Sequence, residues 1–287
     1  MSETTWSIED LQRKSRQIRA TCVQMAFDAR QGHLNGAMSC VEILVALYHG
    51  WLNVGPVLPD QSIDPARDRF VFSKGHACKS FYAVLADRGL IPLQWLATYA
   101  RNDSHLPMHP CKHALHVLET SAGSLGHGLG MATGMAYALR LMDNPARCVA
   151  LLSDGECNEG STWESAMFAA AHKMDRVLAV VDYNRVQSVG RTDHLTGGTS
   201  FEEKFRAFGW AARTIDGHDI AEIRATLNEV PFVRGKPTAI IARTRAGAGV
   251  SFMEDQVLWH YRAPSRDDLD RALAELDARP IYTPEPA

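Results

Sequence analysis

The sequence predicts an α/β protein built on a mostly parallel sheet with helices on both faces. Short apolar runs of strand length alternate with segments in which apolar residues recur every three or four positions. Strands that alternate with helices favour parallel pairing, because each crossover returns the chain to the same edge of the sheet. The 287 residues, 46 % hydrophobic and 22 % charged, suit a globular protein, and no linker or repeat divides them. Residues 1–287 are therefore expected to form a single domain.

The expected elements follow the spacing of the apolar residues. The predicted strands are 69–72, 148–152, 177–182, 211–215 and 238–242. The predicted helices are 8–30, 41–51, 77–88, one ending near 142, 162–172, 201–208, 220–227 and 265–276. Ser39, Ser161 and Ser265 are expected to cap helices, Ser161 together with Glu164 in a capping box. Helices thus fill about 7–51, a loop is expected at 56–65, and about 278–287 should form a short tail.

The composition argues against several classes of protein. A formal net charge of −3 gives no field that would attract nucleic acid or an anionic membrane. The longest apolar runs, such as 177–181, are too short to span a bilayer, and the acidic Glu3, Glu9 and Asp10 are atypical of a signal peptide. The six cysteines form no C-x-x-C pair, which favours reduced thiols in a cytoplasmic protein over disulfides or a zinc site.

Polar residues follow two of the predicted strands. Asp154 comes after the run 148–152, and Asn184 follows the next run, thirty residues further on. Carboxyl ends of parallel strands meet at one edge, where α/β proteins bind ligands. A carboxylate, an amide oxygen and the Val186 carbonyl would form a partial shell for Mg²⁺, and Gly155 would let a phosphate approach closely. An ordinary Asp-Gly turn explains the same spacing, so the residues alone leave both interpretations open.

Several segments resemble motifs of the transketolase family. Residues 153–160, continued by 182–184, are similar to its thiamine diphosphate motif, Gly-Asp-Gly followed by a distant Asn-Asn. Ser153 and Tyr183 depart from that pattern, at positions that supply no metal ligand in the family. Further matches occur in the family's order at 32–33, 73–76, 107–110, 119–128, 249–254 and His260. By this resemblance, the chain is identified with the N-terminal, diphosphate-binding part of a transketolase.

The resemblance implies the thiamine diphosphate-binding fold, with a diphosphate-binding (PP-type) domain, and assigns its site residues. The implied ligands for Mg²⁺, or for Ca²⁺ or Mn²⁺ in its place, are Asp154, Asn184 and Val186. The implied cofactor contacts are His76, Gly123, Ser124, Leu125, Asp154, Gly155, Glu156, Asn184 and His260. The implied catalytic residues are His33, His109, His260 and Glu159.

The histidines divide into two groups. His33, His76, His109 and His260 are expected in loops, where a lone histidine is usually a solvated side chain. Their joint match to family positions implies that they line the substrate channel, hold the diphosphate and handle hydroxyl protons of a sugar. The other loop histidines are His105, His113 and His116, expected at the surface, and His127, whose role stays open.

Two glutamates near the predicted helix 162–172 are interpreted differently. Glu159 matches acids that lie near the subunit interface of transketolases and are thought to link two active sites. A capping box with Ser161 explains Glu164 without a functional role.

The resemblance also implies a partner chain. The family's catalytic glutamate belongs to a second, pyrimidine-binding domain, which follows the diphosphate domain and is not matched here. We therefore expect a separate C-terminal subunit, two copies of each chain in a heterotetramer, and no activity from this chain alone. The implied reaction moves a two-carbon ketol unit from a ketose, phosphorylated or not, to an aldose acceptor.

Three alternatives remain at this stage. The alpha subunit of a 2-oxo acid dehydrogenase has a run much like residues 154–160 but lacks the set of matching histidines. A 1-deoxyxylulose 5-phosphate synthase is a second enzymatic alternative, usually encoded in one chain. A non-catalytic interaction protein that retains the fold is the third, and intact Asp154, Asn184 and His260 argue against it.

Overall fold

The computed structural model describes residues 6–55 and 64–282, and its centre is a parallel five-stranded sheet. The strands are β1 (Arg69–Phe72), β2 (Cys148–Ser153), β3 (Val177–Tyr183), β6 (Ala211–Asp216) and β7 (Thr238–Arg243). Their order is β1-β2-β3-β7-β6, and every neighbouring pair is parallel. The predicted fold class is therefore confirmed, and each predicted strand lies within one residue of the observed one.

Alternate residues of each strand enter two separate cores. Val149 and Leu151 of β2 pack into one core, whereas Ala150 and Leu152 pack into the other. In β3 the same alternation sends Leu178 to the first core. Nearly continuous apolar strands are expected where a parallel sheet is covered on both faces, and this accounts for the apolar runs in the sequence.

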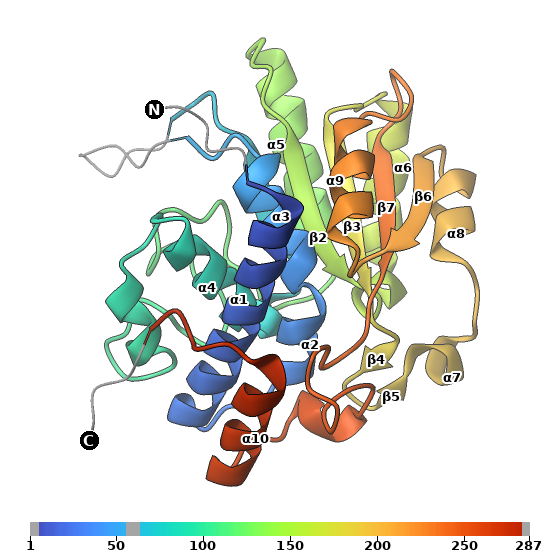
Figure 1. The fold of residues 1–287 in the computed structure, drawn as a ribbon. Coiled ribbons are helices and arrows are strands. Elements are labelled where there is room, and N and C mark those ends of the chain that lie inside the picture. Colours follow the sequence, from blue (N-terminus) through green and yellow to red (C-terminus); the bar gives the residue numbers. More distant parts are fainter. Residues whose placement is uncertain (1–5, 56–63, 283–287) are drawn as a thin grey trace.

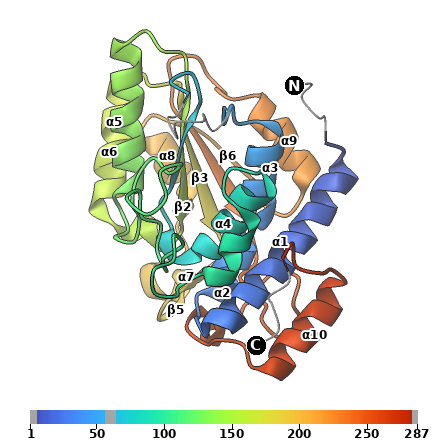
Figure 2. The ribbon, with the colours of Figure 1, turned by 90° about the vertical axis from the view of Figure 1, so that its left-hand side faces the viewer.

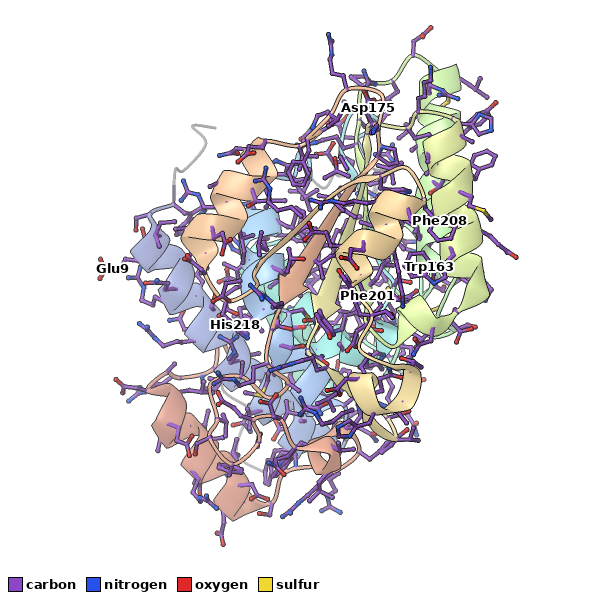
Figure 3. All side chains as sticks on the ribbon, turned by 90° about the vertical axis from the view of Figure 1, so that its right-hand side faces the viewer. Glu9, Trp163, Asp175, Phe201, Phe208 and His218 are labelled. Carbon is purple, nitrogen blue, oxygen red and sulfur yellow. The ribbon has the colours of Figure 1, made fainter. Side chains whose placement is uncertain are left out.

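Helices cover each face of the sheet (Figures 1 and 2). The layer on the first face contains α1 (Ile8–Ala29), α3 (Val41–Gly50), α4 (Cys78–Asp87) and α9 (Ile220–Asn228), and α10 (Arg266–Leu276) packs against α1. The second carries α5 (Gly128–Leu141), α6 (Gly160–Ala171) and α8 (Phe201–Ala207). Trp163 of α6 stacks on Phe208 at the end of α8, with ring centroids 5.3 Å apart (Figure 3).

Several short elements were not predicted. The segment after α1 forms α2 (Leu34–Ser39), although its glycines indicated a break. A small hairpin, β4 (Val186–Gln187) and β5 (Gly190–Arg191), precedes α7 (Thr192–Thr196). The remaining short pieces are 3₁₀ turns: η1 (Gly75–Ala77), η2 (Leu93–Thr98), η3 (Glu156–Asn158) and η4 (Val257–His260).

Of the three predicted helix caps, the structure confirms one and contradicts two. Ser265 caps α10 in a capping box with Asp268, as expected. Ser39 ends α2 rather than capping α3, and its hydroxyl donates to Asp182. The capping box of Ser161 and Glu164 is wrong, because α6 begins one residue before Ser161 and the Ser161 hydroxyl donates to the Gly126 carbonyl. Both corrections have one cause: these hydroxyls bind distant segments.

The chain end and the thiols complete the fold. Most of the predicted loop 56–65 and residues 283–287 of the predicted tail lie outside the described residues. The described part of the tail packs against α1, because the Ile281 backbone N–H donates to Thr21 and the Tyr282 hydroxyl to Asp28.

All six cysteines are free and five are buried, with Cys111 partly exposed. Among the described helices, none is long and apolar enough to cross a membrane.

Candidate functional site

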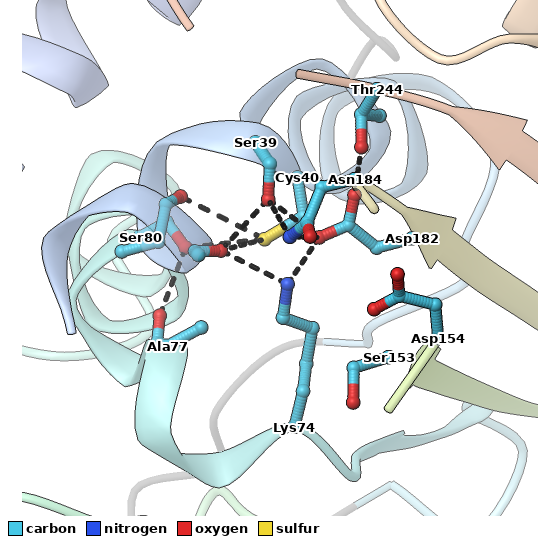
Figure 4. Close-up of polar contacts among 12 residues, drawn as sticks. Ser39, Cys40, Lys74, Ala77, Ser80, Ser153, Asp154, Asp182, Asn184 and Thr244 are labelled. Carbon is cyan, nitrogen blue, oxygen red and sulfur yellow. Dashed lines mark hydrogen bonds and ion pairs between the residues drawn. The ribbon is translucent and has the colours of Figure 1, made fainter. Parts of the chain in front are cut away.

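Asp154 and Asn184 lie at the same edge of the sheet, as the sequence predicts (Figure 4). Ser153 at the end of β2 is the register partner of Asp182 in β3, so the residues that follow leave the sheet side by side. The side chains of Asp154 and Asn184 are both buried. The Asn184 Oδ1 accepts the Val186 N–H at 3.0 Å, which holds the Val186 backbone beside the amide. The parallel topology therefore gathers the three proposed oxygen donors.

Asp154 is a buried carboxylate that is hydrogen-bonded by neutral groups. Its oxygens accept from the Thr192 hydroxyl at 2.6 Å and from the Gly155 N–H at 2.9 Å. Burial, together with the nearby Asp182, raises the pKa of Asp154 to about 6. No group of three His, Cys, Asp or Glu side chains suited to a metal occurs within 6–55 and 64–282. A cation here would thus rest on one carboxylate with amide and carbonyl oxygens, a donor set that fits Mg²⁺ or Ca²⁺.

A buried ion pair lies behind these donors. Lys74 pairs with Asp182, and neither side chain has any exposed surface. Asp182 also accepts hydrogen bonds from Ser39, at 2.6 Å, and from the Thr244 hydroxyl. The Asn184 Nδ2 donates to Ser39 at 3.1 Å (Figure 4), so the amide oxygen is the atom that accepts from the Val186 backbone. The network fixes which atom Asn184 presents.

Glu156 ties the glycine-rich segment to the sheet. Its Oε1 accepts the Gly126 N–H at 2.9 Å and the Ser73 hydroxyl, and Ser73 in turn accepts the Gly128 N–H at 3.1 Å. A Cβ on Gly128 would lie 2.0 Å from the Ser73 Oγ, so only glycine fits there. Glu156 is fully buried, and its carboxylate already accepts hydrogen bonds from these groups of the protein. It shapes the loop that was expected to meet the cofactor.

Four histidines from distant parts of the chain form one cluster. His33 is central, with ring centroids 5.1 Å from His260, 5.7 Å from His76 and 6.4 Å from His109. The backbone N–H of His33 donates to the backbone carbonyl of His260 at 2.7 Å, which holds the two segments together. The expectation of a loop holds for His33 and His109 and is wrong for the other two, because His76 lies in η1 and His260 ends η4. The predicted set is nevertheless brought together.

Glycines leave space beside this cluster. A Cβ on Gly36 would lie 3.5 Å from His76, and one on Gly123 would lie 3.4 Å from His109. Gly75 packs directly on the 122–123 backbone, since a Cβ there would lie 2.9 Å from the Gly123 nitrogen. The loops expected to hold the diphosphate are thus in contact with the histidines.

The histidines of the cluster are kept neutral. Burial and the neighbouring His260 lower the pKa of His33 to about 4, and burial with the Lys74 charge lowers the pKa of His260 to about 4. Burial also lowers the pKa of His76 well below its usual value, and that of His109 to a lesser extent. Neutral imidazoles carry one donor and one acceptor, which suits contacts with hydroxyl groups.

Comparison with known proteins identifies the fold's relatives. The model of the "Transketolase, thiamine diphosphate binding domain" family matches residues 11–280. The chain belongs to the transketolase family. It is 38 % identical over 277 residues to an apulose-4-phosphate transketolase subunit of Actinobacillus succinogenes, covering 96 % of this chain and 99 % of that one. It is 35 % identical to a 6-deoxy-6-sulfo-D-fructose transketolase subunit of a Clostridium strain, over 93 % of this chain and 96 % of the relative.

Single-chain transketolases are matched over less than half of their length. The crystal structure of Campylobacter jejuni transketolase superposes with a TM-score of 0.86 at 26 % identity, covering 97 % of this chain but 44 % of that one. Rat transketolase is 32 % identical over 94 % of this chain and 42 % of its own length. The chain therefore corresponds to the thiamine diphosphate-binding part of a transketolase.

Some predicted site residues stand apart from the cluster. Glu159 is exposed at the start of α6, and among the described residues nothing joins its carboxylate to the histidines. Ser124 and His127 are exposed on the glycine-rich segment. His105 stacks on Trp95 at 4.2 Å, and the other two histidines of that loop, His113 and His116, are exposed, as expected for surface residues.

Sequence reasoning missed two buried lysines of this transketolase-family site. Lys74 neutralises Asp182, as described above, and Lys79 donates to the Gly32 carbonyl at 2.6 Å. Lys79 also lies 5.1 Å from the centroid of the Tyr99 ring, and burial lowers its pKa. The signal for Lys74 was the charged Asp182 at the end of an apolar strand, since a buried carboxylate needs a partner. No comparable signal marks Lys79.

Proposed function

We propose that this chain is the cofactor-binding subunit of a split transketolase. The observation that carries the proposal is that one chain holds both the histidine cluster and the strand-end oxygens and matches the apulose-4-phosphate transketolase subunit over nearly its full length. The reaction is the transfer of a two-carbon ketol unit from a ketose to an aldose. The relatives' names, an apulose phosphate and a sulfofructose enzyme, support an anionic sugar as substrate without naming it.

The strand-end residues would hold the metal and the diphosphate. Asp154, the Asn184 Oδ1 and the Val186 carbonyl would bind Mg²⁺, with Ca²⁺ or Mn²⁺ as substitutes, and the metal would bind the diphosphate oxygens. Gly155 would let the backbone come close, and His76 would donate to the diphosphate from the opposite loop. Gly123, Ser124 and Leu125 would line the cofactor. Glu156 would act through these loops, because its carboxylate already accepts from Gly126 and Ser73.

The histidines would serve the sugar. Thiamine diphosphate, when bound, supplies the carbon nucleophile that breaks the carbon–carbon bond beside the ketose carbonyl. His33, His109 and His260 would bind the sugar hydroxyls and take or return their protons, a contribution of roughly 10²–10⁴ in rate. Their lowered pKa values keep them unprotonated near neutral pH, so they can act as proton acceptors. Glu159, exposed at the start of α6, would act at a subunit interface.

The assembly we propose contains a pyrimidine-domain partner and two copies of each chain. The relatives that are themselves named as transketolase subunits support the partner. The outer surface of α5 and α6 supports self-association, because it exposes large apolar side chains. These are Leu141, Met142, Met167 and Phe168, exposed by 44–71 %. The free cysteines suit a reducing compartment such as the cytoplasm.

Reconstitution tests the proposal. This chain and a candidate pyrimidine-domain chain would be purified separately, and ketol transfer would be assayed with xylulose 5-phosphate and other ketoses, and with pyruvate as the dehydrogenase control. Turnover is expected only from the mixture, and robust turnover by this chain alone would refute the split-enzyme proposal.

Calorimetry on the reconstituted complex tests the cofactor site. Asp154→Ala should abolish Mg²⁺-dependent binding of thiamine diphosphate. Asp175→Ala is the matched control, because Asp175 precedes β3 and lies at the opposite end of that strand (Figure 3). Equal binding by the two variants would remove Asp154 from the metal site.

A further inference from the structure

A second cleft opens at the carboxyl ends of the sheet. It measures about 710 Å³, within the range of small-molecule pockets. Tyr183 at the end of β3, Arg243 at the end of β7 and Asp216 at the end of β6 line it, whereas the clustered histidines do not. The register places Arg243 directly between the other two. The cleft therefore crosses the ends of three neighbouring strands.

The topology marks this place as a ligand crevice. After β3 the chain continues to α8 on one face of the sheet, whereas after β7 it leads to α10, which packs against α1 in the helix layer of the other face. In open α/β sheets, ligands bind where the chain leaves adjacent strands in opposite directions. The β3–β7 pair meets that condition, and the cleft lies there.

The acidic residues of the cleft are already engaged. Glu42 accepts from the Arg19 guanidinium at 2.5 and 2.6 Å and from the His218 Nδ1 at 2.9 Å. The His218 Nε2 accepts the backbone N–H of Arg245 at 2.9 Å, which leaves Nδ1 as the nitrogen that donates to Glu42 (Figure 3 labels His218). Internal partners thus account for the whole Glu42 carboxylate.

The other two carboxylates also have partners. Glu254 accepts from the Arg245 guanidinium at 2.8 Å and from the Gly249 N–H at 3.0 Å. The Asp216 carboxylate accepts a hydrogen bond from the backbone N–H of His218 at 2.8 Å. The cleft acids are consequently held in place by the protein.

Two arginines remain with free guanidiniums. Arg185 and Arg243 line the cleft and are exposed, and neither guanidinium has a hydrogen bond or an ion pair with residues 6–55 or 64–282. Four arginines in all face three carboxylates, so the cleft carries excess positive charge. Arginine binds phosphate through two parallel hydrogen bonds, which gives it geometric preference for that group.

We propose that this cleft binds a phosphate group, free or carried on a small polyol, through Arg185 and Arg243. The volume exceeds that of a phosphate ion, so a sugar phosphate also fits. The site is distinct from the proposed cofactor site, because Asp154, Asn184 and the clustered histidines do not line the cleft, whereas Thr244, which does, donates to Asp182. Arg185 connects the two, since it stands between the proposed metal donors Asn184 and Val186.

Titration calorimetry of the full chain tests this, in metal-free buffer at fixed ionic strength, with inorganic phosphate, ribose 5-phosphate and ribose. Both phosphate compounds should bind saturably, and ribose should not. Tighter binding of ribose 5-phosphate would identify a carried phosphate, and equal binding a free one. Arg243→Gln should weaken binding about tenfold or more, as expected for lost charge-assisted hydrogen bonds. Arg243→Lys should retain part of the affinity.

Two controls separate this site from the cofactor site. Arg88→Gln removes the same charge from an exposed position outside the cleft and should leave binding unchanged. His76→Gln alters the proposed diphosphate site and should also leave it unchanged. The proposal is overturned if neither phosphate compound binds, or if Arg243→Gln binds as tightly as the unaltered chain; a loss of binding in His76→Gln would then place the phosphate at the proposed diphosphate site. Thermal unfolding of each variant confirms that a loss of binding is not a loss of fold.

Discussion

Lys74 and Asp182 form an ion pair that is completely buried beneath the carboxyl ends of β2 and β3. Lys74 also donates to the Gly36 carbonyl at 2.9 Å, so one ammonium group joins α2 to the sheet. Asp182 outweighs the effect of burial and raises the pKa of Lys74, so the lysine is charged. The Asp182 carboxylate also accepts a hydrogen bond from the Ser39 hydroxyl, and that hydroxyl accepts one from the Asn184 amide. The pair therefore supports the geometry of the proposed metal site.

Removing one partner of that pair should strongly destabilise the protein. Lys74→Met would leave the Asp182 carboxylate buried without its cation, and we expect the free energy of unfolding to fall by about 3–5 kcal/mol. Urea denaturation measures it. The control is Arg213→Met, because the Arg213–Glu229 pair is solvent-exposed and its loss should change the unfolding free energy far less. Similar losses in both variants would show that the buried pair has no special weight.

Two glycines of α5 should respond oppositely to alanine. A Cβ on Gly128 would overlap the Ser73 side chain, so Gly128→Ala should cost about 1–3 kcal/mol of unfolding free energy through overpacking. Gly134 lies in the same helix with nothing within 4 Å of its Cβ position. Gly134→Ala should stabilise the chain by about 0.5–1 kcal/mol, because alanine is the better helix former. Denaturation of the isolated chain decides, and a stabilising Gly128→Ala would contradict the packing described.

The histidine cluster should make stability depend on pH. In the unfolded chain a histidine has a pKa near 6.5, whereas His33 and His260 have values of about 4 in the folded protein. Between these values the unfolded state binds more protons, so the unfolding free energy should fall as pH is lowered from about 6.5 to 4. The slope is at most about 1.4 kcal/mol per pH unit for each histidine. His260→Gln should flatten the profile, and an unchanged slope would show that His260 is not shielded from protonation.

The exposed apolar side chains of α5 and α6 should govern self-association. Phe168→Glu places a charge on this surface and should shift the complex toward a single copy of each chain, as measured by sedimentation velocity. Val233→Glu is the matched control, because Val233 is similarly exposed, at 46 % against 44 %, and lies in the loop between α9 and β7. If both variants sediment like the unaltered protein, the copies associate through another surface.

The sequence was sufficient to predict features that depend on the local residue pattern. It was not sufficient for features that depend on contacts between distant segments. The strands were predicted almost to the residue, because a sheet covered on both faces needs apolar runs. Helix α2 was missed, because all six of its residues are buried and packing rather than propensity stabilises it. The strand-end donors followed from parallel topology, and the histidine cluster from the order of motifs.

The sequence did not predict which charged groups the fold buries or brings together. Lys79 is buried although lysine is rarely found there, and nothing in its neighbourhood of the sequence marks it. Likewise Arg19, Arg185 and Arg243 come from distant segments and meet only in the folded cleft. Such sets depend on which residues the fold brings together, so spacing along one chain does not reveal them.

The distribution of the thiols offers a reporter for assembly. Cys111 is the one cysteine that is partly exposed rather than buried, and a hydrogen bond from the Ala114 backbone lowers the pKa of its thiol. Burial raises the pKa of the other five, among them Cys78 and Cys148. A maleimide dye would therefore label the unaltered protein at one position, two residues from His109. A change in its fluorescence on mixing with a candidate partner chain would report whether that chain covers the region beside the histidines, with no engineered cysteine.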